Sequence, residues 1–158
     1  RPEASIQLQQ LVSLYPANSR FQLRLISLLI SMDDYEGTLR TISDYLDKGT
    51  KPAEPDLSLT RIWKARAYLG RGETELSRNT FAKIDPVFHY ARDQLPGWSV
   101  AWYILTDGQL HDLAGRRGQA ISAYKEILSI AKSTYVNITI LEAARAGLSM
   151  PYQLHIGQ

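Results

Sequence analysis

Apolar residues recur at intervals of three and four along almost the whole chain, and strand-like alternation of apolar and polar residues is scarce. This spacing places apolar side chains on one face of a helix, so it predicts amphipathic α-helices. The pattern occurs in Ile6–Leu14, Phe21–Met32, Leu39–Leu46, Leu59–Leu69, Leu76–Ile84, Val100–Leu113, Ala120–Ile130 and Ile138–Leu148. We therefore expect an all-α protein made of helices of roughly 10 to 16 residues.

Residues that start or end helices separate these segments, which predicts short turns between them. They are Pro16, Asp33-Asp34, the stretch KGTKPAEPD, Gly70, Gly72, Asp85-Pro86, Pro96-Gly97, Gly115, Gly118 and Pro151. Asp85-Pro86 has the form of an N-cap followed by proline at the first helical position. It predicts a short additional helix through VFHYARDQL.

The segments also repeat as pairs. A small residue or threonine is followed, four and seven positions later, by residues that are aromatic or branched. The four copies are Ala4–Leu8–Leu11, Thr38–Ile42–Tyr45, Ser77–Phe81–Ile84 and Ala120–Tyr124–Ile127, and their first residues lie 34, 39 and 43 positions apart. Twelve positions before the last three copies stand Ile26, Ala65 and Gly108. Small residues at these places let two antiparallel helices approach closely.

The turn inside each pair has its own residue preference. Gly72 and Gly115 stand where the first helix must end in a left-handed backbone conformation, which glycine adopts without strain. Asp33 takes that position in the first pair, and aspartate tolerates it less well. The stretch GRRG, from Gly115 to Gly118, is therefore interpreted as a turn, with Arg116 and Arg117 exposed and Ala120 buried close to Gly108.

These residues resemble the tetratricopeptide repeat family over roughly residues 3 to 132. The best matches to its pattern are ARAYLGRGETELSRNTFAKI and GQLHDLAGRRGQAISAYKEI, and ASIQLQQLVSLYP is similar to a second helix closed by the family's proline. Ile26, Thr38 and His111 depart from the family's usual glycine, alanine and tyrosine. The resemblance implies an all-α solenoid of antiparallel helix pairs: one domain, 1–158, with a half repeat at 3–16, repeats at 19–48, 57–85 and 99–132, and a capping helix at 135–148.

In this family the first helices of the pairs line a concave groove that meets the ligand. The resemblance implies a peptide-binding groove carrying Arg20, Arg24, Ser27, Trp63, Arg66, Trp102 and Gln109. Arginine and tryptophan are typical residues of binding hot spots, although both tryptophans could instead be core residues. The family's clamp for a terminal carboxylate uses lysine and asparagine, which Leu23, Ser27 and Trp63 do not supply. The arginines alone favour an acidic or carboxylate-bearing partner.

Composition narrows the function classes. The 158 residues carry 18 basic and 16 acidic side chains, a net charge of +2, which is too balanced for a dedicated nucleic-acid binder. The absence of cysteine excludes disulfides and thiolate chemistry. No apolar run approaches the roughly 18 residues that span a membrane. The chain starts at Arg1, which indicates a mature form or an excised piece of a longer product. The sequence leaves its compartment open between cytoplasm and periplasm.

Motifs for chemistry are missing. GRGETE lacks the third glycine and preceding strand of a dinucleotide fingerprint, and GRRG lacks the lysine-serine ending of a P-loop. His89, His111 and His155 have no metal-ligand spacing, and no nucleophile elbow occurs. The basic cluster around Arg61 and Arg71 is best interpreted as a solvated helix face, and the sequon at Asn137 as a chance match.

We therefore expect a non-catalytic protein–protein interaction module without metal or cofactor, which binds a peptide or partner protein in its groove. One alternative is a structural scaffold that self-associates through its repeat ends, near Ile6 and Leu141. Another is a regulatory domain of a larger enzyme. The resemblance, rather than any single residue, carries the step from fold to function.

Overall fold

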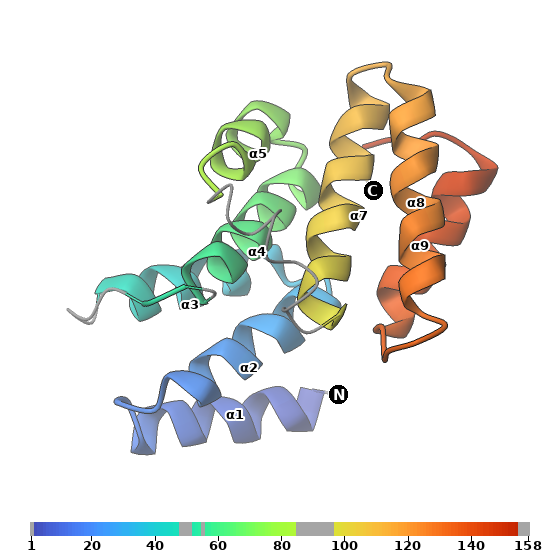
Figure 1. Cartoon of the computed structure of the whole chain (residues 1–158). Coiled ribbons are helices and arrows are strands. Elements are labelled where there is room, and N and C mark those ends of the chain that lie inside the picture. The colour runs from blue at the N-terminus through green and yellow to red at the C-terminus, as the bar shows by residue number, and fades with distance from the viewer. Residues whose placement is uncertain (1, 48–51, 55, 85–96, 155–158) are drawn as a thin grey trace.

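The computed structural model describes residues 2–47, 52–54, 56–84 and 97–154, and in this part of the chain every regular element is an α-helix (Figure 1). The helices are α1 (Pro2–Leu14), α2 (Ser19–Ser31), α3 (Tyr35–Asp47), α4 (Asp56–Gly70), α5 (Thr74–Phe81), α7 (Gly97–Leu113), α8 (Arg117–Ile130) and α9 (Ile138–Ser149). The predicted all-α class is confirmed. The extra helix predicted through VFHYARDQL, with His89, and the terminal His155 lie outside the described residues.

Neighbouring helices in the sequence pack against one another. Contacts join α1 to α2, α2 to α3, α4 to α5, α7 to α8 and α8 to α9. Helices α2, α4 and α7, which are the first members of the three pairs, also contact each other in that order across the middle of the molecule (Figure 1). None of the described helices is both long and apolar enough to cross a membrane.

Three turns between paired helices close in the same way. Asp33, Gly72 and Gly115 have positive φ angles of 58°, 78° and 74°. After each of them, the next backbone N–H donates to the carbonyl oxygen five residues earlier, with distances of 3.0, 2.9 and 2.9 Å. This is the hydrogen bond of a Schellman C-cap, which needs the left-handed residue. The predicted turn positions are therefore confirmed.

Asp33 should be the least favourable of these turn residues, because its Cβ crowds the backbone in the left-handed region. We expect Asp33→Gly to raise the free energy of unfolding by about 0.5–1 kcal/mol, even though the hydrogen bond from the Tyr35 hydroxyl to Asp33 is lost. The matched control is Asp34→Ala, because the Asp34 carboxylate caps α3 by accepting from the Gly37 N–H at 2.9 Å. It should lower stability by about 1 kcal/mol. Urea unfolding measures both, and a less stable Asp33→Gly protein would contradict the first expectation.

Small residues lie at two of the predicted helix contacts. Ser77 is fully buried, and its hydroxyl donates to the Ala65 carbonyl oxygen at 2.7 Å, which joins α5 to α4. At Gly108, a Cβ would meet the Tyr124 ring at 2.9 Å and the Ala123 side chain at 3.1 Å. Ala120 is fully buried, as predicted, but Tyr124 and Ala123 are the nearest side chains to Gly108, because the ring of Tyr124 crosses the α7–α8 contact.

Candidate functional site: a polar face that holds the C-terminal tail

The structure brings four of the seven predicted groove residues together. The Arg66 guanidinium on α4 lies 4.8 Å from the centre of the Trp102 ring on α7. Its Nη1 donates to Gln109 Oε1 at 3.0 Å. Trp63 and Trp102 are only 1% and 2% exposed, and both belong to the main apolar cluster of the molecule. Their burial fits the core alternative. Gln109 is buried too, at 5% exposure, so among these four residues Arg66 alone keeps some exposed surface.

The other three predicted groove residues lie elsewhere. Arg24 and Ser27 on α2 line a separate cavity of about 440 Å³, together with residues from α1 and from the start of α9. Arg20 is exposed and lines an open hollow around the turn between α1 and α2. The predicted seven residues therefore do not form one continuous site.

The segment after α9 occupies the face beside Arg66. We call residues 150–154 the tail. Met150 has extended backbone angles, φ −150° and ψ 152°, and the chain then runs back toward α7 (Figure 1). The Tyr152 backbone N–H donates to Asp112 Oδ2 at 2.9 Å. An extended segment is thus held on a helical face by a hydrogen bond from its main chain.

Asp112, in the last turn of α7, connects three parts of the molecule. Its carboxylate has no exposed surface. Arg117 Nη1 on α8 donates to both of its oxygens at 3.0 and 3.1 Å, and the Tyr124 hydroxyl donates to Oδ2 at 2.7 Å. With the Tyr152 N–H, the buried charge therefore has both an ion-pair partner and hydrogen bonds, which a buried carboxylate requires.

Arg117 also contacts the chain that leads into the tail. Its Nη2 donates to the Leu148 carbonyl oxygen at 3.2 Å, near the end of α9. The expectation that Arg117 is an exposed turn residue is therefore wrong: its side chain is 30% exposed and paired. Its neighbour Arg116 is exposed, as predicted, and donates from Nε to His111 Nδ1 at 2.7 Å. The two arginines differ because only Arg117 begins α8 on the side facing α7 and α9.

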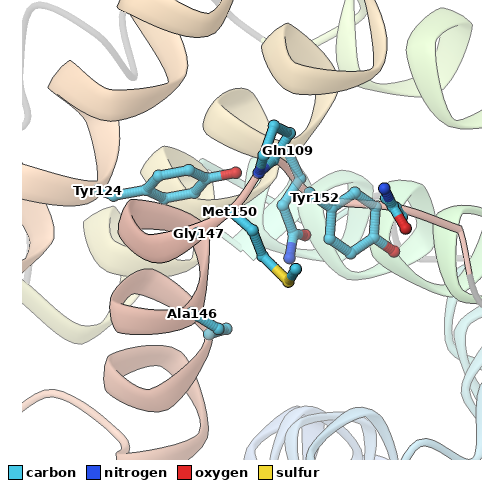
Figure 2. Close-up of a pocket in the computed structure, with 9 residues that line it drawn as sticks. Gln109, Tyr124, Ala146, Gly147, Met150 and Tyr152 are labelled. Atoms are coloured by element: carbon cyan, nitrogen blue, oxygen red, sulfur yellow. The ribbon is translucent and has the colours of Figure 1, made fainter.

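A cavity of about 280 Å³ lies beside the tail, between α7, α8 and α9. Figure 2 shows Gln109, Tyr124, Gly147, Met150 and Tyr152 around it, with the Gln109 side chain between those of Met150 and Tyr152. The wall is mostly apolar, and the polar residues Gln109 and Gln153 also line it. The tail forms part of this wall, so moving the tail would change the shape of the cavity.

Arg66 is a cation in unusual surroundings. Its Nε atom is buried and has no hydrogen-bond partner. Among the described residues, no carboxylate is within ion-pair distance of its guanidinium. Burial lowers the pKa of Arg66, whereas the nearby Tyr152, Tyr35 and Asp33 groups act to raise it. A buried guanidinium without a counter-ion carries a cost that an anionic ligand would relieve.

Sequence reasoning missed the tail and the role of Arg117. Pro151 indicated only the end of a helix, and no periodicity marks the residues beyond it. The pairing of Asp112 with Arg117 and Tyr124 was not foreseen either. One signal was present: an aspartate in the last turn of a helix, with an arginine five positions later across a turn, needs a partner when it is buried.

Tyr124 is held between two glycines, and this geometry gives a stability prediction. A Cβ on Gly147 would lie 2.5 Å from the ring. We expect Gly147→Ala to lower the free energy of unfolding by about 1–3 kcal/mol, because the packed ring must shift. The control is Gly118→Ala on α8, where a Cβ meets nothing within 4 Å. That change should raise stability by up to about 1 kcal/mol. Thermal unfolding followed by circular dichroism measures both, and equal effects would contradict the prediction.

The buried tyrosines predict a loss of stability at high pH. Burial, with the hydrogen bond to Asp33, raises the pKa of Tyr35 from 10.0 to about 12. Burial also raises the pKa values of Tyr45, Tyr124 and Tyr152. These hydroxyls ionise more readily in the unfolded chain, so their contribution to stability is complete below pH 10 and is lost between pH 10 and 12.

Absorbance of tyrosinate, recorded together with circular dichroism, tests this expectation. Some of the nine tyrosines should ionise near pH 10 with the helices intact, and the rest only as the helices unfold. A single class that ionises near pH 10 in a folded protein would contradict it.

No protein-family model, curated protein or solved structure matches this chain. The resemblance to tetratricopeptide repeats therefore rests on the spacing of its own residues. Within the described part of the chain, no group of three or more potential metal-ligating side chains gathers at one place.

Proposed function

We propose that this chain is a non-catalytic interaction module that binds an extended segment of a partner protein on the face formed by α4 and α7. The observation that carries this proposal is the tail: its Tyr152 N–H bonds to the buried Asp112 carboxylate. This face accepts a hydrogen bond from the main chain of an extended segment of the same molecule. The same acceptor can bind the main chain of an extended segment from a partner protein.

We also propose that the helix pairs form a tetratricopeptide-like solenoid. In three turns a residue with positive φ stands at the same place, and the next N–H donates to the carbonyl oxygen five residues earlier. This recurrence supports a repeated unit. Contacts of α2 with α4, and of α4 with α7, support first helices that lie side by side. In such an arrangement the first helices share one face, on which an extended ligand can contact several repeats.

The contacts of the proposed face are polar at its centre. A partner would meet Arg66, whose guanidinium donates to the buried Gln109 side chain and contacts the Trp102 ring by a cation–π interaction. The tryptophans therefore act through packing rather than by touching the partner. This differs from the expectation that Trp63 and Trp102 themselves bury partner side chains, because the structure leaves almost none of their surface exposed.

A peptide experiment tests the proposed function. The chain is ended after Ser149, and a fluorescent peptide with the sequence of residues 150–158 is added. We expect saturable binding, which Asp112→Asn weakens because it removes the charge that accepts from the Tyr152 N–H, and which Arg116→Gln, on the exposed turn, leaves unchanged. Circular dichroism confirms that each variant is folded. No binding to a folded, shortened chain would contradict the proposal.

Self-association is a second candidate, favoured by the outer surface of α1. Ile6 and Leu14 are 53% and 71% exposed on this helix, and α2 is its main packing neighbour. Sedimentation velocity over a hundred-fold concentration range tests it. Oligomers that Ile6→Glu abolishes would support a scaffold that stacks through its ends, whereas a monomer at every concentration would exclude it.

A further inference from the structure

Arg66 carries a positive charge, and residues 150–154 of the tail contain no acidic side chain to pair with it. The Arg66 side chain is placed by two contacts, the stacking on Trp102 and the hydrogen bond to Gln109. Its Nε remains buried without a partner. The neighbouring residue of the tail is Tyr152, whose neutral hydroxyl offers Arg66 no negative charge at neutral pH. An arginine that is held in place with no carboxylate partner among the described residues indicates a site prepared for an anion.

The backbone of the tail fixes which side chain faces this charge. The hydrogen bond from the Tyr152 N–H to Asp112 sets the register of the extended segment. In this register the Tyr152 side chain lines the same cavity as Gln109, the residue that accepts from Arg66 (Figure 2). Arg66 acts to lower the pKa of Tyr152, which burial raises. A segment bound by the same main-chain contact would place its corresponding side chain beside the guanidinium.

Other charges around the position are already paired or exposed. Asp112 is compensated by Arg117. Asp33 accepts from the Tyr35 hydroxyl and lies at the surface, where solvent and salt reduce its repulsion of another carboxylate. Tyr35 and Tyr124 are neutral below pH 10 because burial raises their pKa values. Arg66 therefore dominates the charge that a ligand side chain would meet.

We infer that the partner of this face is an extended acidic segment, with an aspartate or glutamate at the position that Tyr152 occupies, and that the tail is a weaker occupant which this segment displaces. The inference rests on the proposed function and names the class of its ligand. The carboxylate forms a charge-assisted hydrogen bond with Arg66, which a tyrosine hydroxyl cannot replace.

The full chain tests the charge preference without a known partner. Tyr152→Glu and Tyr152→Gln differ only by a charge, and amide hydrogen exchange at residue 152 reports whether the tail is docked on Asp112. We expect about ten-fold greater protection of this amide in Tyr152→Glu at pH 7. In Arg66→Gln proteins the two variants should be equal. Equal protection with Arg66 present would overturn the inference.

A pH series keeps the test decisive if Arg66→Gln does not fold. With Arg66 intact, the advantage of Tyr152→Glu should vanish below about pH 4, where a glutamate side chain is protonated. Any other group that titrates in this range is present in both variants, so its effect cancels in the comparison. An advantage that persists at low pH would show that charge is not its cause.

Competition in solution separates the two proposals. Peptides with the sequence of residues 149–154, carrying Glu or Gln in place of Tyr, are added to the unaltered full chain. The Glu peptide should remove the exchange protection of the Tyr152 amide at about ten-fold lower concentration. Displacement at equal concentrations would overturn the acidic preference alone. No displacement by either peptide would count against the proposed function, while the Tyr152 variants still test Arg66.

Discussion

Replacing Asp112 with alanine is expected to lower the free energy of unfolding by about 3–5 kcal/mol, because it breaks a buried, hydrogen-bonded ion pair. The carboxylate has no exposed surface and accepts from Arg117, Tyr124 and the Tyr152 N–H. Without it, the buried Tyr124 hydroxyl has no acceptor, and the tail loses its main-chain contact. Urea unfolding measures the stability, and hydrogen exchange at Tyr152 should show a released tail.

The same helix provides the control for this change. Asp107 is 38% exposed and lies 3.5 Å from His111 Nε2. A surface pair of this kind contributes no more than about 1 kcal/mol, so Asp107→Ala should cost at most that amount. If Asp112→Ala cost no more than Asp107→Ala, the carboxylate would not be the connection between α7, α8 and the tail.

Replacing Trp63 with alanine should have an effect of similar size, about 3–5 kcal/mol, for a different reason. The indole is 1% exposed and packs in the main apolar cluster, so its removal leaves a large cavity. Trp63→Phe is the control: it keeps most of the volume and removes the buried Nε1 that has no partner, so it should cost clearly less.

This prediction tests in solution the core position that the structure gives Trp63, against the groove role that the sequence left open. A core residue gives the large loss of stability, measured by guanidinium unfolding followed by circular dichroism. A groove residue would leave stability within about 0.5 kcal/mol and would weaken only the binding of a partner. For this reason Arg66→Gln, rather than Trp63→Ala, is the variant with which to test binding.

The candidate site was predictable only in part. The repeat pattern predicted one shared face for Arg66 on α4 and for Trp102 and Gln109 on α7. In the structure Arg66 contacts both of these residues. Arg24 was assigned to the same groove by the same register, yet it lines another cavity. Register along a helix is a local property, whereas the direction in which successive helices turn depends on the contacts between them.

What the sequence determined by itself was the helical class and the turns, because both depend on neighbouring residues. A period of three to four apolar positions specifies a helix face, and Asp33, Gly72 and Gly115 specify the left-handed ends through their own backbone preferences. These interactions span at most a few residues, so they can be predicted from a short stretch of sequence.

The tertiary structure alone decided where the tail lies, that Asp112 pairs with Arg117 and Tyr124, and that Trp63 is core. Tyr152 meets Asp112 across 40 positions, and Arg66 meets Gln109 across 43. Such contacts form only after the helices have packed, since burial removes water and makes each charge and donor find a partner in the protein. These pairs depend on how all the helices pack, so they cannot be predicted from a short stretch of sequence.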